Sequence, residues 1–137
     1  MKDLINIDCQ EFVNYSREHS DKLAIEFAEF FPFGAQVDLD GNLTGVSYQS
    51  ESEKPKSAEV IKSLTAYFEN ELIENTIRSY SITYDSILTN SDYPKGIDCI
   101  TILTKHKMED ASIEYFFPYL INESGAIEYH KGWAIRN

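Results

Sequence analysis

The residues from Phe30 to Tyr48, FFPFGAQVDLDGNLTGVSY, constrain the fold most, because they mark the change from helix to sheet. Pro32 lacks an N–H group and disfavours helical geometry in the residue before it, so we expect the first helix to end at that point. From Ala35 the apolar residues recur at every second position, which predicts a strand with one buried face. Residues 40–42 are Asp-Gly-Asn, a typical tight turn. The sequence therefore predicts a helix end followed by a β-hairpin.

The turn of this hairpin resembles the start of a calcium-binding loop. Counted from Asp38, the calcium loop needs Gly at position six and Glu at position twelve, where this chain has Leu43 and Gln49. Asp38 and Asp40 also alternate along the strand, which would place two carboxylates on one strand face. We expect an ordinary solvated turn rather than a calcium site or a catalytic carboxylate pair.

Four short motifs carry a family resemblance: residues 31–35 (FPFGA), 38–41 (DLDG), 54–57 (KPKS) and 117–119 (FPY). With them the chain resembles a family of uncharacterised small bacterial proteins that carry an F-x-P-F-G-A … D-G signature after an N-terminal helix. The resemblance covers Glu29 to Trp133. Its motifs consist of turn and core residues, so it implies a shared fold and no particular activity, cofactor or catalytic residue.

Composition indicates a single globular domain spanning residues 1–137, with 42% hydrophobic residues. The chain has 23 acidic and 12 basic residues, giving a formal charge of −11. This charge disfavours nucleic acid and suits either a basic protein partner or solubility alone. The first residues show no signal peptide and no stretch is long enough to cross a membrane, so we expect a cytoplasmic protein without membrane contact. Cys9 and Cys99 lack metal-ligand spacing and are expected to be reduced structural thiols.

The remaining pattern predicts an α+β domain with the element order α-β-β-α-β-β-β-β. A helix beginning near Asp8 precedes the hairpin, and a second helix, capped by Ser57, runs to about Asn75. Four strands are then expected at residues 77–88, 97–107, 111–117 and 126–136, with Pro118 marking either the end of the third strand or an edge position. We expect two layers, with both helices on one face of a mostly antiparallel sheet of about six strands.

No catalytic constellation is evident in the sequence. The three histidines, His19, His106 and His130, do not pair at metal-ligand spacing, and no Ser lies in a nucleophile elbow. We therefore expect structural histidines, no metal or cofactor, and a non-enzymatic protein.

Two functional interpretations follow from this pattern. The first is a small acidic binding protein, for example an immunity-type inhibitor of a basic bacterial toxin, in which aromatic residues on an open sheet face contact the partner. The predicted contact residues are Tyr80, Tyr84, Tyr115, Tyr129 and Trp133, although the same aromatics would also suit core and cross-strand packing. The alternative is a small-molecule-binding protein or enzyme with a pocket between helices and sheet, lined by Tyr67, Tyr84 and His106.

Overall fold

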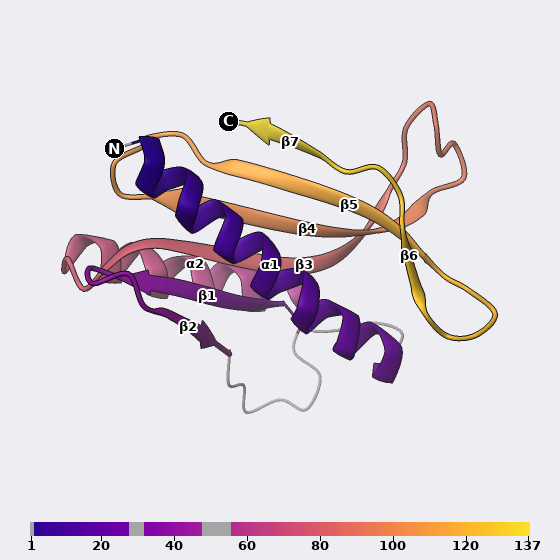
Figure 1. Ribbon diagram of the computed structural model, residues 1–137, viewed down its shortest axis with the longest axis horizontal. Helices are drawn as coiled ribbons and strands as arrows, with labels where there is room; N and C mark the ends of the chain where they lie inside the picture. The colour runs from indigo at the N-terminus through magenta and orange to yellow at the C-terminus, as the bar shows by residue number, and fades with distance from the viewer. Residues whose placement is uncertain (1, 28–31, 48–55) are drawn as a thin grey trace.

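The computed structural model describes residues 2–27, 32–47 and 56–137. These residues contain two helices and seven strands, and the strands form one antiparallel sheet (Figure 1). In chain order the elements are α1 (Lys2–Phe27), β1 (Phe33–Asp38), β2 (Leu43–Val46), α2 (Ser57–Ile73), β3 (Ile77–Leu88), β4 (Ile97–His106), β5 (Ile113–Ile121), β6 (Ile127–Tyr129) and β7 (Trp133–Arg136). The predicted α+β class is thus confirmed.

The strands lie in the order β2-β1-β3-β4-β5-β6, and every pair is antiparallel. β6 and β7 both pair with β5 on its outer side, β7 along its first half and β6 along its last residues. The predicted strand 126–136 is therefore two short strands. This division is why the sheet has seven strands where about six were expected.

The two helices lie on opposite faces of the sheet, so the prediction that both cover one face is wrong. On one side Ser79 of β3 donates its hydroxyl to Asp8 of α1, and on the other side the next residue, Tyr80, stacks on Phe68 of α2. Because successive residues of a strand point to opposite faces, these contacts place the helices on different sides. Figure 1 shows α1 in front of the sheet and α2 behind it.

The prediction of one helix-covered face failed because α1 covers the hydroxyl-bearing side of β3. Ser79, Ser81 and Thr83 alternate with Tyr80 and Ile82, a pattern typical of a strand with a solvated Ser/Thr face. All three are nevertheless at most 1% exposed. These small side chains let the helix approach closely. The hydroxyl of Thr83 donates to Ser16 of α1 over 2.7 Å and that of Ser79 donates to Asp8, whereas the buried Ser81 hydroxyl has no hydrogen-bond partner among the described residues.

Apolar residues form a separate core on each side of the sheet. Under α2, Phe68 packs in a cluster with Ile77, Tyr80 and Ile82 of β3, and the lack of a side chain at Gly34 leaves room for its ring. Under α1, Phe12 packs on the odd-numbered residues of β1. Further buried residues on the α1 side join β1, β4 and β5: Phe33, Ile100, Ile102 and Tyr119.

Several helix boundaries differ from the predictions. α1 begins at Lys2 rather than near Asp8. The expected helix end at Phe31 lies outside the described residues. The N-cap of α2 is Lys56, which makes no side-chain capping bond, so the predicted Ser57 cap is wrong.

Pro118 does not end β5, which continues to Ile121. Its carbonyl accepts the N–H of His130, beyond the outer side of β5, over 2.8 Å. In an antiparallel strand the N–H and C=O of one residue point the same way, so the missing N–H of Pro118 also faces outward. The proline therefore costs no hydrogen bond between β5 and β4, where it pairs with Cys99.

Candidate functional site

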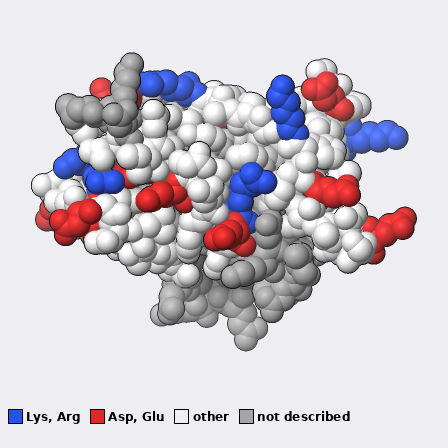
Figure 2. All heavy atoms as spheres, in the orientation of Figure 1, with Lys and Arg blue, Asp and Glu red and all other residues white. Residues whose placement is uncertain are grey.

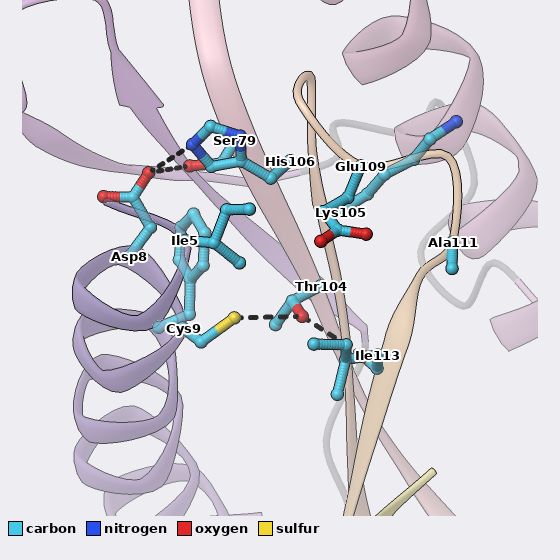
Figure 3. Close-up of a pocket in the computed structure, with 11 residues that line it drawn as sticks. Ile5, Asp8, Cys9, Ser79, Thr104, Lys105, His106, Glu109, Ala111 and Ile113 are labelled. Atoms are coloured by element: carbon cyan, nitrogen blue, oxygen red, sulfur yellow. Dashed lines mark hydrogen bonds and ion pairs between the residues drawn. The ribbon is translucent and has the colours of Figure 1, made fainter. Parts of the chain in front are cut away.

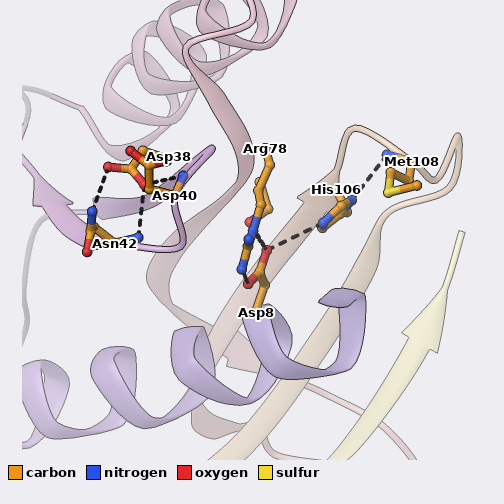
Figure 4. Close-up of polar contacts among 8 residues, drawn as sticks. Asp8, Asp38, Asp40, Asn42, Arg78, His106 and Met108 are labelled. Carbon is orange, nitrogen blue, oxygen red and sulfur yellow. Dashed lines mark hydrogen bonds and ion pairs between the residues drawn. The ribbon is translucent and has the colours of Figure 1, made fainter. Parts of the chain in front are cut away.

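A buried polar cluster joins α1 to β3 and β4 (Figure 4). The Asp8 carboxylate is 1% exposed and receives two hydrogen bonds from Arg78, at 2.9 Å from Nε and 2.7 Å from Nη2. The Ser79 hydroxyl donates to the same carboxylate over 2.7 Å. His106 completes the cluster, with its Nε2 3.4 Å from Asp8 Oδ2. The bidentate ion pair compensates the charge that burial would otherwise penalise.

The hydrogen bonds of His106 define its tautomer. Its Nδ1 accepts the backbone N–H of Met108 over 3.1 Å, so in the neutral ring the proton lies on Nε2. That proton faces Asp8, but the contact lacks hydrogen-bond geometry and leaves Nε2 unsatisfied. Burial is the main cause that lowers the pKa of His106, and the negative charge of Asp8 only partly opposes it. The neutral ring is thus the favoured form near pH 7.

A small cavity of about 10 Å³ lies beside this cluster (Figure 3). Its lining includes Asp8, Cys9, Ser79, Thr104 and His106. The volume matches about one water molecule and is far below the several hundred Å³ of ligand pockets. The cavity cannot admit an organic substrate.

The cluster holds the fold together and does not form a nucleophilic site. The Ser79 hydroxyl donates to the Asp8 carboxylate, which the Arg78 guanidinium also binds, rather than to a histidine, so the serine lacks the histidine base of a nucleophilic site. The thiol of Cys9 lies 3.7 Å from the Thr104 hydroxyl, and among the described residues it makes no hydrogen bond to His106. The bonds of Asp8 therefore fix α1 on the sheet, and sequence reasoning missed this role because it interpreted Asp8 as a helix cap.

The other predicted polar residues have structural contacts. His19 stacks on Tyr15, and His130 Nδ1 lies 2.8 Å from the Tyr93 hydroxyl. Cys99 is completely buried, and burial raises the pKa of its thiol.

The two aspartates of the first hairpin do not share a strand face, because Asp40 lies beyond the end of β1. Instead the Asp38 carboxylate accepts the N–H groups of Asn42 and Asp40, each over 2.9 Å, and these bonds lower the pKa of Asp38 (Figure 4). The carboxylate therefore stabilises the turn that joins β1 and β2.

The five predicted contact residues do not lie on one surface. Tyr80 is 2% exposed beneath α2 and is a core residue, so its expected position on an open face is wrong. Tyr115 and Tyr129 face the α1 side, where the Arg17 guanidinium lies 4.4 Å from the Tyr129 ring centre. Tyr84 and Trp133 lie on the α2 side.

The alternative pocket is not formed by the residues predicted for it. His106 faces α1, whereas Tyr84 faces the α2 side, so the sheet separates them. Tyr67 is a surface residue of α2, 43% exposed. An open groove of about 430 Å³ instead lies between α1 and β5. Its lining comprises Asn6, Cys9, Gln10, Val13, Tyr115 and Phe117.

An apolar surface remains on the α2 side because α2 packs mainly on β3 and β1. We call it the Trp133 surface and define it by two rows of residues across β3, β4, β5 and β7: Tyr84, Phe116 and Trp133 in one row, and Leu103, Glu114 and Ile135 in the other. Trp133 is 37% exposed and Ile135 47% exposed.

The rings of Phe116 and Trp133 stack with centres 5.5 Å apart, which fixes both side chains on the Trp133 surface. Glu114 lies between the apolar residues and accepts a hydrogen bond from Asn137 over 2.8 Å. Among the described residues Glu114 has no ion-pair partner. On the opposite, α1 side, acidic and basic side chains are interspersed (Figure 2). The Trp133 surface therefore combines rigid aromatic area with an uncompensated carboxylate.

The fold and these sites define a small acidic α+β protein with a helix on each face of its sheet. The chain matches no protein-family model, and comparisons with curated proteins and with solved structures find no match either. The resemblance to small bacterial proteins therefore stays a prediction. Neither described helix is both long and apolar enough to cross a membrane. Within residues 2–27, 32–47 and 56–137, no three potential metal-ligating side chains come together.

Proposed function

We propose that this protein binds a basic protein through the Trp133 surface. The observation that carries the proposal is the stacked, partly exposed Trp133 near Glu114, on the α2 side of β5 and β7 and away from β3 and β1, on which α2 mainly packs. Tryptophan is among the residues that contribute most to protein interfaces, because a rigid ring buries a large area at low entropic cost.

Charge supports a cationic partner. The formal charge of −11 attracts a basic protein over distances of several ångströms and accelerates encounter at low ionic strength. Glu114 would then pair with a lysine or arginine of the partner, and Trp133 would offer its ring to the same cation or to a neighbouring apolar side chain. An immunity-type inhibitor that blocks the basic surface of a toxin is one specific form of this function.

The experiment begins with affinity capture of basic proteins on the immobilised chain at about 20 mM NaCl, where electrostatic attraction is strong. A captured protein is then purified and titrated against the chain in solution. Supporting results are a 1:1 complex, an affinity that falls as salt rises, and loss of the partner's own activity in the complex. The proposal fails if no purified candidate binds with a dissociation constant below about 10 µM, the range of weak specific complexes.

The groove between α1 and β5 supports a second candidate function, the binding of a small molecule. Its volume of about 430 Å³ lies within the range of ligand sites, and aromatic side chains from β5 face amide side chains of α1 across it. A screen of small aromatic compounds by NMR tests this candidate. Shifts confined to α1 and β5, absent in Val13→Trp, support it, and a lack of localised shifts contradicts it.

A further inference from the structure

β7 is the least buried strand of the sheet, since all four of its residues are exposed, a pattern that no other described strand shows. It forms the outer edge beside the first half of β5, at the top of the sheet in Figure 1. An exposed edge strand that carries Trp and Ile is a template for pairing with another strand.

The hydrogen-bond pattern shows which groups of β7 are available. Asn137, just beyond β7, donates its N–H to Ser112, so the odd-numbered residues point their backbone groups toward β5. Since the direction alternates along an antiparallel pair, the N–H and C=O of Ala134 and Arg136 point outward. No other described strand pairs with that edge.

This edge is complementary to itself. In an antiparallel pair of two β7 strands, Ala134 faces Ala134 of the second copy and the two residues exchange both backbone hydrogen bonds. The same register places Trp133 beside Ile135 of the second copy, twice, on the α2 side of the joined sheets. Arg136 then faces Gly132, which has no side chain to collide with it.

The register also avoids unfavourable neighbours. The smallest β7 side chain, Ala134, lies at the twofold axis, and along the four residues of β7 no carboxylate faces a carboxylate. The exposed apolar residues at 133 and 135 would contact each other rather than water. A basic heterologous strand would pair with the same backbone groups but would not require this symmetry.

We propose that two copies of this protein associate through their β7 edges, with a twofold axis at Ala134, to form one continuous sheet. The pairing leaves the Trp133 surfaces of both copies on one side, so the dimer would present a surface of twice the width. The net charge of the two copies opposes their association, so added salt strengthens the dimer. Binding to a basic protein shows the opposite salt dependence.

Sedimentation velocity of the pure full-length chain, from about 5 µM to about 500 µM, tests the proposal across the range of weak dimers. We expect reversible dimerisation that tightens between about 20 and 500 mM NaCl. Ala134→Pro removes an N–H that points away from β5, so the monomer fold is retained while the dimer weakens by roughly tenfold or more. Ala134→Val keeps the N–H and serves as the matched control.

Circular dichroism verifies that both variants are folded. The emission of Trp133, the only tryptophan of the chain, should shift to shorter wavelength on dimerisation in wild type and in Ala134→Val. A wild-type chain that stays monomeric over the whole range overturns the proposal. So does a dimer that Ala134→Pro leaves unchanged, since that dimer would use another surface or a heterologous contact.

Discussion

Replacement of Asp8 by Ala tests whether the buried cluster fixes α1 on the sheet. The substitution removes the acceptor of two Arg78 hydrogen bonds and one Ser79 hydrogen bond, and it leaves the guanidinium without its counter-charge. Breaking a buried pair from one side typically costs about 3–5 kcal/mol. Because the Arg78 side chain is still 13% exposed and can turn toward water, we expect the lower end, about 3 kcal/mol, in the free energy of unfolding.

Urea unfolding followed by circular dichroism measures this cost, with Glu18→Ala on the exposed side of α1 as the control, expected to stay within about 0.5 kcal/mol of wild type. Arg78→Met in the Asp8→Ala background completes a double-mutant cycle. The double variant should be more stable than the sum of the single losses predicts, by about 2 kcal/mol. A loss below about 1 kcal/mol for Asp8→Ala, or additive effects in the double variant, would show that the Asp8 cluster does not fix α1 on the sheet.

Two further predictions concern the two sides of the sheet. Burial in the folded protein lowers the pKa of His106, whereas in the unfolded chain the histidine keeps a pKa of about 6.5. As the pH decreases through this range, the unfolded chain binds a proton that the folded protein does not, and the free energy of unfolding therefore decreases. His106→Gln should lose this part of the slope between about pH 7.5 and 5.5, and urea midpoints that decline equally in both proteins would contradict it. On the α2 side, a Cβ at position 34 would lie 2.6 Å from two ring atoms of Phe68. Gly34→Ala should therefore lower the free energy of unfolding by about 1–3 kcal/mol, and it should lower it less in a Phe68→Leu background. Equal losses in both backgrounds would show that the Phe68 ring is not the cause.

Much of the fold could be predicted because local signals and packing agree. The strand from Ile77 to Leu88 was predicted at both ends, since hydroxyl-bearing side chains alternate with apolar or aromatic ones from Ser79 to Tyr84 in its centre. The hairpin at Asp38 to Asn42 followed from turn chemistry, and the structure adds the carboxylate bonds that hold it. These features depend on residues that lie near one another in the sequence.

The arrangement of the helices could not be predicted in the same way. The serines and threonine on one side of β3 have side chains that suit water or a close helix equally well, and only the partner decides. That partner is α1, whose Asp8 and Ser16 contact residues about 70 positions away. The Asp8–Arg78–His106 cluster draws on three separate elements, and no spacing in the chain relates them.

The Trp133 surface depends on the same long-range arrangement. Tyr80 and Tyr84 share a strand face by alternation, but α2 buries the first and only borders the second. Similarly, Trp133 joins Phe116 only because β7 returns to pair with β5. The aromatic composition indicated a contact surface, whereas its location required the sheet order.

The central claim is that the partner contacts Trp133, and calorimetry with two alanine variants tests it most directly. Trp133→Ala removes the aromatic side chain from the proposed surface, and Tyr67→Ala removes a similarly exposed aromatic from α2, at 43% exposure against 37%. We predict that the affinity for the purified basic partner falls by about 2 kcal/mol, roughly thirtyfold, in Trp133→Ala and stays unchanged in Tyr67→Ala. Equal affinities in the two variants, or a loss confined to Tyr67→Ala, would contradict the account.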